Sequence, residues 1–417
     1  MSGGGHAPGA PGGAPGPPTL EALRSEPNAL AADYARFRVA ERLLLTGHSH
    51  QAWPDRGFEG QRLAWLDAAE LVDGKWERAF ERADRVREGF AALLGDAGEG
   101  VALGASTHDL LVRFLSALPL GRRPRLVTTD SEFHTIHRQT ERLAEEGIEV
   151  VRVPFRPAET VGERIAAAVD GRTAAALVSS VSFLDARIAG GLPRAMEACR
   201  AAGSELLVDA YHHLCALPFS MEGLEDAFVT GGGYKYCQLG EGNCFLRIPP
   251  GCRLRPVVTG WFAEFEALEA SGGEEPPRVP YADGPGRFAG STYDPTSHYR
   301  GSEVLAYFRE RGLEPELLRR VSRHQVGLLA SRFDALDLDP RIVDRERDAG
   351  PERIGGFLAL RSPAAGELSA ALLERGVRTD WRGDRLRLGP APYLCDRQLE
   401  DAVRALGEAA VEVGRPG

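Results

Sequence analysis

The chain has 417 residues, 43% of them hydrophobic, with a formal net charge of −10 and a pI near 5.6. This length allows a sizeable buried core in two or three structural units, and the acidic balance without basic runs excludes nucleic acid and anionic membranes as expected partners. The six cysteines show no CxxC pair or zinc spacing, which predicts reduced thiols, no metal site and a cytoplasmic protein.

The N-terminal part of the chain combines a polar tail with mainly helical patterns. Residues 1–18 are rich in Gly, Pro and Ala, lack the features of a signal peptide, and predict a disordered tail. A helical segment is expected over residues 19–38, followed by a short apolar strand and a turn in "ERLLLTGHSHQAWP". A long charged helical stretch is expected over residues 57–94.

Short apolar runs then alternate with helix-length segments. The runs are "PRLVTTD", "EVVRVPF", "AAALVSSVSF", "ELLVDAYHH", "AFVTGGG" and "NCFLRIP". This alternation predicts a mainly parallel sheet covered by helices on both faces. "EASGGEEPPRVPYADGPG" interrupts the pattern as a boundary loop, and helices near residues 302–335 and 365–376 with a strand in "DRLRLGP" predict a smaller α+β domain.

These patterns predict an α/β chain in four parts. They are a disordered tail (1–18), an N-terminal segment (19–60), a large domain carrying the main sheet (61–285) and a small C-terminal α+β domain (286–417).

The strongest single signal is a lysine. Of 50 basic residues only Lys75 and Lys235 are lysines, so 50 − 2 = 48 are arginines. Lys235 stands in the glycine-rich stretch "TGGGYKYCQLGEGNC". An amine can lose its proton and form a Schiff base, whereas a guanidinium stays protonated. Composition alone leaves chance placement as an equally good explanation of Lys235.

Polar residues at strand ends give Lys235 a chemical context. Ligands of open α/β sheets bind at the carboxyl ends of the strands. "SELLVDAYHH" places Asp209 at such an end and His212 three residues later, and Lys235 follows Asp209 by 235 − 209 = 26 residues. A buried carboxylate beside a Schiff-base lysine suits pyridoxal 5'-phosphate (PLP), because it keeps the pyridine nitrogen protonated. Taken alone, Asp209 is better explained as an ordinary turn residue at a strand end.

Three further positions suit the same cofactor and an amino-acid substrate. Ser106 or Thr107 caps a predicted helix whose backbone N–H groups suit a phosphate. Phe133 follows a strand and could stack on a flat ring, and Arg387 in an apolar strand suits a bidentate grip on a carboxylate. An ordinary capped helix, a core aromatic and a solvated arginine are the alternative interpretations.

Together these residues resemble the class V, fold-type I PLP enzymes, and within them kynureninase, over residues 41–410. The resemblance implies a large domain with a mainly parallel seven-stranded sheet sandwiched by helices, and a smaller C-terminal α+β domain. "DAYH" is similar to the family's Asp-x-x-His, which implies Asp209 on the pyridine nitrogen and His212 near the ring oxygen or phosphate. "GYKY" resembles Ser-Tyr-Lys-Tyr, which implies Tyr234 as a phosphate contact and proton relay, and Lys235 as the cofactor lysine.

Other matching segments imply a substrate clamp and a shared site. "RLRLGPAPYL" resembles the family strand whose arginine, here Arg387, holds the substrate carboxylate. "TGWFAEFE" and "RFAGSTYDP" imply that Trp261 and Thr292 reach the phosphate from a partner subunit, so the resemblance implies a homodimer with shared active sites. Ser179 and Phe133 fall at family pocket positions.

The departures from the family lie in the side-chain pocket. "GHSHQ" replaces the family's Gly-Asn-Ser-Leu-Gly turn and places His48, Ser49 and His50 near the substrate. "FLDA" replaces Tyr-Tyr-Thr-Gly, and "TYDP" replaces Asn-Pro-Pro. The resemblance therefore supports the cofactor chemistry more strongly than the identity of the leaving group.

The resemblance implies a PLP-dependent hydrolase of tryptophan catabolism that cleaves the Cβ–Cγ bond of an L-kynurenine-like amino acid, giving alanine and an anthranilate. A carbon–sulfur β-lyase, or an aminotransferase or oxidative deaminase acting on a cysteine conjugate, uses the same first steps. A non-catalytic protein of this fold is a second alternative. A cysteine desulfurase is disfavoured because residues 350–390 contain no cysteine. The sequence assigns no role to His108.

Overall fold

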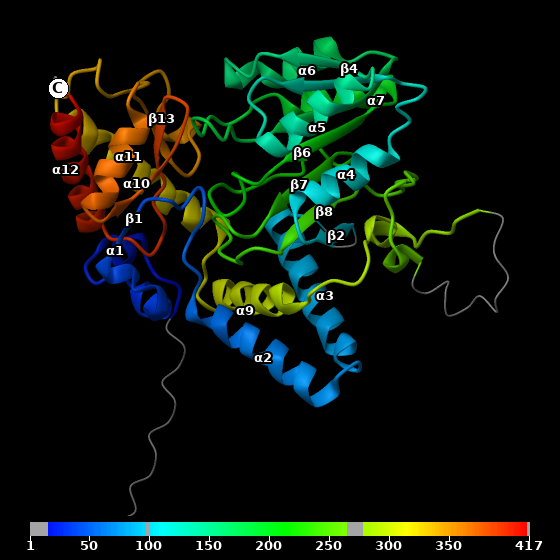
Figure 1. The fold of residues 1–417 in the computed structure, drawn as a ribbon, viewed down its shortest axis with the longest axis horizontal. Helices are drawn as coiled ribbons and strands as arrows, with labels where there is room; N and C mark the ends of the chain where they lie inside the picture. The colour runs from blue at the N-terminus through cyan, green and yellow to red at the C-terminus, as the bar shows by residue number, and fades with distance from the viewer. Residues whose placement is uncertain (1–15, 97–99, 265–277, 415–417) are drawn as a thin grey trace, which may run out of the picture.

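The computed structural model describes residues 16–96, 100–264 and 278–414. A seven-stranded sheet with its helices forms one lobe, and a four-stranded sheet with the C-terminal helices forms a second (Figure 1). Residues 1–15 of the expected tail and residues 269–277 of the expected boundary loop lie outside the described residues.

The large sheet has the strand order β2-β8-β7-β6-β5-β3-β4. β8 runs antiparallel to β2 and β7, and every other pair is parallel, so the expected mainly parallel seven-stranded sheet is confirmed. The short β2, "VALG", is the one strand of this sheet that the pattern of apolar runs missed. The strands are β2 (Val101–Gly104), β3 (Arg125–Thr129), β4 (Glu149–Val153), β5 (Thr173–Ser179), β6 (Glu205–Asp209), β7 (Phe228–Gly232) and β8 (Cys244–Arg247).

Helices cover both faces of this sheet because side chains alternate along each strand. Leu177 and Leu207 face one side and pack in the cluster formed with α4 (Thr107–Ala117) and α5 (His134–Glu145). Val178 and Val208 face the other side, toward α6 (Val161–Ala168) and α7 (Leu192–Ala202). The period of two therefore produces two separate hydrophobic layers, as expected for a sandwiched sheet.

Two expected helices are interrupted. The stretch 57–94 forms α2 (Asp55–Leu71) and α3 (Lys75–Leu94), separated at Val72, whose φ of 55° ends the first helix. The segment 19–38 forms α1 (Leu20–Arg24) and a 3₁₀ helix (Ala31–Phe37), because Pro27 between them cannot donate a helical hydrogen bond. Charge patterning alone did not reveal either break.

The second lobe combines helices with a small sheet ordered β12-β13-β10-β9. β1 pairs in parallel with β11, so the N-terminal segment joins this lobe. Its helix α12 was not expected from the sequence. The elements are β1 (Leu43–Leu44), α10 (Pro315–Asp334), β9 (Asp344–Arg345), β10 (Leu358–Arg361), α11 (Ala365–Glu374), β11 (Val377–Arg378), β12 (Asp380–Arg382), β13 (Arg385–Leu388) and α12 (Asp396–Val413).

Helix α9 (Thr296–Glu310) lies against α2 in the lower part of the view (Figure 1). The two helices approach so closely that a Cβ on Gly60 would lie 2.5 Å from the carbonyl oxygen of Tyr299. Glycine at this position therefore permits the helix pair.

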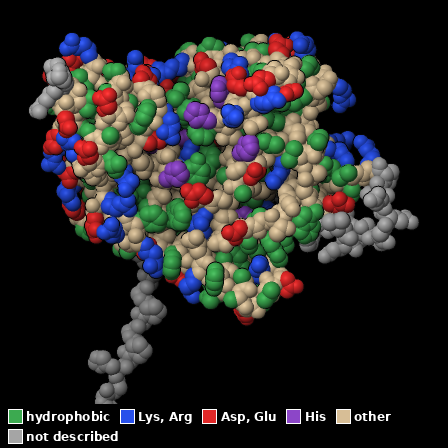
Figure 2. All heavy atoms as spheres, in the orientation of Figure 1, with side chains coloured by type: hydrophobic (Ala, Val, Ile, Leu, Met, Phe, Trp, Pro, Cys, Tyr) green, Lys and Arg blue, Asp and Glu red, His purple; other side chains and the backbone are tan. Residues whose placement is uncertain are grey.

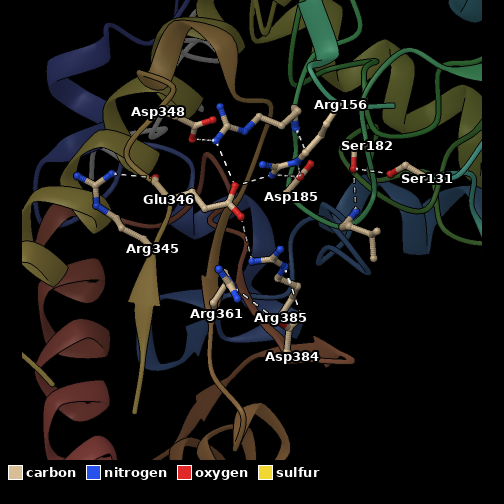
Figure 3. Close-up of polar contacts among 12 residues, drawn as sticks. Ser131, Arg156, Ser182, Asp185, Arg345, Glu346, Asp348, Arg361, Asp384 and Arg385 are labelled. Carbon is tan, nitrogen blue, oxygen red and sulfur yellow. Dashed lines mark hydrogen bonds and ion pairs between the residues drawn. The ribbon is translucent and has the colours of Figure 1, made fainter. Parts of the chain in front are cut away.

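A cluster of ion pairs joins the two lobes beside the loop that carries Phe183. Figure 3 shows Glu346 of the small lobe between Arg156 of the large lobe and Arg385 of β13. Arg156 also pairs with Asp185 of the loop. The cluster thus holds the loop at 182–187 against the β12–β13 hairpin.

The surface in view carries interspersed acidic and basic side chains, with several histidines near its centre (Figure 2). Across the ranges described, no helix is both long and apolar enough to cross a bilayer.

Candidate functional site

The polar residues singled out from the sequence meet at the carboxyl edge of the large sheet. Strand register places Ser179, Asp209 and Thr230 side by side on β5, β6 and β7. Lys235 follows in the loop between β7 and β8. Because parallel strands end at one edge, residues far apart in sequence converge here.

Lys235 is buried in an aromatic and imidazole environment. Its side chain is 5% exposed, and its Nζ lies 2.9 Å from Nε2 of His212, 4.5 Å from the ring centroid of Tyr211 and 5.1 Å from that of Phe133. Burial, reinforced by the positive charge of Arg387, lowers the pKa of Lys235 to about 7, although Asp209 opposes this shift. A substantial fraction of the amine is therefore neutral and nucleophilic near neutral pH.

His212 is the neutral partner of this amine. Burial first, and then the charge of Lys235, lowers the pKa of His212 well below its usual value. A neutral imidazole presents one ring nitrogen as an acceptor, so His212 accepts a hydrogen bond from the ammonium form of Lys235.

Asp209 presents an available acceptor. Its Oδ1 accepts a hydrogen bond of 2.8 Å from the backbone N–H of Tyr211. Across the described parts of the chain, its other carboxylate oxygen has no hydrogen-bond partner. Burial raises the pKa of Asp209, against the opposing effects of the Tyr211 N–H and Lys235. A cationic N–H donor placed beside Asp209 would satisfy this oxygen.

Glu132 is a site residue that the sequence reasoning missed. Its carboxylate accepts hydrogen bonds from Ser179 Oγ (2.6 Å), Ser179 N (3.1 Å) and Thr129 Oγ1 (2.6 Å). Burial raises the pKa of Glu132 to about 7 despite these donors. The sequence feature that could have indicated Glu132 is its position shortly after the end of a predicted strand and directly before Phe133.

Ser106 and Thr107 occupy the start of α4 as expected. Ser106 Oγ accepts the backbone N–H of Asp109 at 3.1 Å, which makes it the N-cap. Thr107 Oγ1 lies 3.6 Å from Cys244 Sγ, and that sulfur lies 3.8 Å from the Tyr211 hydroxyl. A short chain of contacts therefore links the helix start to the surroundings of Lys235.

Other expected site residues lie nearer the surface. Tyr234 stacks on His50, with ring centroids 4.8 Å apart, and also contacts Tyr211. Trp261 Nε1 donates to Thr292 Oγ1 at 3.3 Å, and both side chains are exposed, unlike the buried Lys235 and His212. His108 in the first turn of α4 is also exposed. Ser49 is half-buried, and its Oγ lies 3.2 Å from His50 Nδ1.

Arg387 and His48, both buried, meet at the half-buried Asp380, which the sequence reasoning did not identify. Asp380 Oδ1 accepts from Arg387 Nε (2.9 Å) and contacts His48 Nε2 (2.7 Å), and Oδ2 accepts from Arg387 Nη2 (2.6 Å). Arg387 Nη1 donates to the carbonyl oxygen of Phe183 at 2.6 Å. The signal was present in "DWRGDRLR", because a two-residue turn at Gly383 and Asp384 places Asp380 directly opposite Arg387.

The charges of this cluster are well defined. Burial lowers the pKa of His48 to about 4, so His48 is neutral at physiological pH. Burial acts against the charged form of Asp380, but the hydrogen bonds from His48 and Arg387 outweigh it and lower its pKa. Asp380 and Arg387 therefore form an ion pair with no net charge of its own, in which Arg387 is buried and Asp380 is half-buried. Arg382 Nη2 lies 3.8 Å from Asp380 Oδ2 as a further cation.

Comparison of the structure identifies the class of fold. The chain has an α/β fold of the fold-type I class found in PLP-dependent enzymes. It superimposes on a C-DES mutant with glycine covalently linked to its PLP cofactor, with a TM-score of 0.78 and 14% identity over 90% of this chain and 98% of that one. An apo cysteine desulfurase from Thermococcus onnurineus NA1 gives 0.76 and 14% identity over 93% and 98% of the two chains.

Sequence comparison supports the same broad class. The chain is 22% identical over 331 residues to the uncharacterized aminotransferase YcbU of Bacillus subtilis strain 168, covering 79% of this chain and 84% of the relative. The structure of the cystine C–S lyase C-DES with its product cysteine persulfide also matches, with a TM-score of 0.75 and 14% identity over 89% and 98% of the chains. No family model matches the chain. The expected class V, aminotransferase-like fold is confirmed, and the expectations of an enzyme and a PLP cofactor agree with these relatives.

Proposed function

We propose that this protein is a PLP-dependent enzyme of the aminotransferase-like class that acts on the amino group of a small molecule. The observation that carries the proposal is the buried Lys235 amine, whose pKa is lowered to about 7, with Asp209 nearby. One carboxylate oxygen of Asp209 has no hydrogen-bond partner among the residues that the structure describes. The residues present fit this cofactor. They supply an amine, an acceptor for the pyridine N–H, aromatic faces and a capped helix start for the phosphate.

When bound, PLP supplies an electron sink for the bonds at the carbon that bears the substrate nitrogen. Lys235 would hold the cofactor aldehyde and, once released by the substrate amine, would move the proton at that carbon. Asp209 would accept the pyridine N–H. Phe133 would cover one face of the ring, and Ser106 and Thr107 would receive the phosphate. His212 would accept a proton or hydrogen bond from Lys235.

Amino-group transfer is the reaction outcome that we infer within this class. It needs only the proton transfers that Lys235 and His212 can perform, and a named relative is an aminotransferase. Carbon–sulfur lysis is the second candidate, since a matched structure is a C–S lyase. Kynureninase-type hydrolysis is a finer hypothesis that requires Arg387 to hold a free α-carboxylate.

A cysteine desulfurase mechanism is not proposed for this chain. Such a mechanism needs an accessible thiol that can reach the substrate sulfur. Cys395 follows the β13 strand, but it is buried at the start of α12. Cys237, near Lys235, is buried as well.

A homodimer is part of the proposal. Large apolar side chains stand exposed on α2, including Trp65 at 79%, and Trp261 is 45% exposed. Exposed apolar groups of this size are typical of subunit interfaces. A partner subunit would bring its Trp261 and Thr292 to the phosphate.

The function is tested by the products of the reconstituted protein. Purified protein is incubated with PLP and candidate amino donors, with and without a keto-acid acceptor, and the products are identified by mass. Carbonyl products that depend on the acceptor support amino-group transfer. Thiol with pyruvate and ammonia would indicate the lyase, and anthranilate with alanine would indicate kynureninase-type hydrolysis. Absence of PLP binding would refute the whole proposal.

A further inference from the structure

The guanidinium of Arg387, the group expected to hold a substrate carboxylate, already donates three of its five N–H groups within the protein. Nε and Nη2 donate to Asp380, and Nη1 donates to the carbonyl oxygen of Phe183. Every guanidinium nitrogen therefore has a partner within the protein. Arg387 is only 4% exposed, so solvent does not compete for these bonds.

Asp380 is held in this position by the strand register and by His48. Residue 380 lies directly opposite residue 387 in the β12–β13 ladder, and His48 Nε2 lies 2.7 Å from its Oδ1. His48 is fully buried and packs on the Phe357 ring, with ring centroids 4.6 Å apart. A Cβ on Gly389 would lie only 2.1 Å from His48 Nδ1, so the imidazole has little room to move away. The carboxylate of Asp380 is thus fixed against Arg387.

The electrostatic consequence concerns incoming anions. Arg387 and Asp380 cancel each other's charge, and His48 is neutral at physiological pH. A substrate carboxylate brought to Arg387 would lose its water and meet the like charge of Asp380. The further cation at Asp380 is Arg382, whose Nη2 lies 3.8 Å from Asp380 Oδ2; its side chain is 45% exposed, so water screens its charge. An uncharged substituent at the same position meets no such repulsion.

We propose that Asp380 is a specificity-determining residue that excludes a free α-carboxylate, so that the enzyme takes amines or carboxyl-blocked amino compounds. This inference rests on the proposed PLP function and assigns its substrate class. It also gives His48 a role, as the positioning residue that holds Asp380 in place.

The test compares matched ligand pairs that differ only in the carboxylate. The pairs are L-kynurenine with kynuramine and L-phenylalanine with 2-phenylethylamine. Dissociation constants are taken from the visible absorbance of the PLP-loaded protein and from the ligand-induced rise in its thermal midpoint, so turnover is not needed. The proteins are the wild type, Asp380→Asn, and Asp384→Asn as the matched control. Asp384 lies in the turn of the same hairpin and contacts Arg361 and Arg385 at the surface (Figure 3).

In the wild type, we expect each amine to bind at least about tenfold more tightly than its amino acid. In Asp380→Asn, this ratio shifts by about tenfold or more toward the amino acid, because Arg387 regains an uncompensated charge. Asp384→Asn keeps the wild-type ratio. The wild-type comparison requires no substitution, so it is decisive even if Asp380→Asn folds poorly.

Two results would overturn the inference while leaving the proposed function intact. One is a wild-type preference for the amino acids. The other is an Asp380→Asn variant with weaker amino-acid binding, which would mean that Asp380 orients Arg387 as a carboxylate clamp. A protein that shows no PLP absorbance at all fails at an earlier step and refutes the proposed function itself.

Discussion

Replacing Glu132 with glutamine tests the electrostatics of the site in the cofactor-free protein. The folded-state pKa of Glu132 is raised from 4.5 to about 7, chiefly by burial. A raised carboxyl pKa means that the folded protein binds this proton more tightly than the unfolded chain does. The contribution of Glu132 to stability therefore falls as pH rises from about 4.5 to about 7, and it is constant above that range.

The size of this pH effect follows from the shift in the Glu132 pKa. Between about pH 5 and pH 8, the contribution of Glu132 to the free energy of unfolding falls by roughly 2 to 3 kcal/mol. A glutamine at position 132 does not titrate. Its side-chain oxygen can still accept the hydrogen bond from Ser179 N, and its side-chain NH₂ can donate to the Ser179 hydroxyl once that hydroxyl rotates. The stability of Glu132→Gln relative to wild type should therefore rise by about 2 to 3 kcal/mol from pH 5 to pH 8.

Urea unfolding of the cofactor-free proteins at several pH values measures this difference. Other titrating groups cancel in the comparison of variant with wild type, and Glu163→Gln on the exposed face of α6 serves as the matched control. A difference for Glu132→Gln that stays constant across pH would refute the reasoning, because Glu132 would then titrate alike in the folded and unfolded states.

Two further predictions concern packing and assembly. Gly60→Ala should lower the free energy of unfolding by about 1–3 kcal/mol, because its Cβ would clash with the Tyr299 carbonyl oxygen. Gly171→Ala is the control, because a Cβ at residue 171 meets open space. Equal stability of the two variants would contradict the α2–α9 packing. Sedimentation should show a dimer whose PLP affinity falls when Trp261 is replaced by alanine, whereas a monomer with full PLP affinity would contradict a shared site.

The sheet was predictable because its signals are local. Apolar runs of strand length separated by helical segments indicated the sandwiched sheet, and strand-end residues such as Asp209 were placed by the general geometry of open α/β folds. Short or interrupted elements escaped this reasoning. β2 has only four residues, and the break between α2 and α3 depends on the backbone conformation of Val72.

The identity of the site residues was predictable from the sequence, but the side-chain contacts between them were less so. Lys235 and His212 were expected near one another, and the structure places their side-chain nitrogens in contact. Arg387 was read as a free cation because its partner is a neighbour in space, across a hairpin. The hairpin register that places Asp380 opposite it is encoded by the turn at Gly383, so this pairing could have been found from the sequence. The packing of His48 on Phe357 could not have been found from the sequence, because it depends on the tertiary contact between two segments about 300 residues apart in the chain.

The central claim is that Lys235 carries the cofactor, and reductive trapping tests it most directly. The protein is incubated with PLP, treated with borohydride and mapped by peptide mass spectrometry, with Lys235→Ala analysed in parallel. We predict a phosphopyridoxyl group on Lys235, none on Lys75, and loss of the visible absorbance in Lys235→Ala. Modification of Lys75 alone, or unchanged absorbance in Lys235→Ala, would contradict the account.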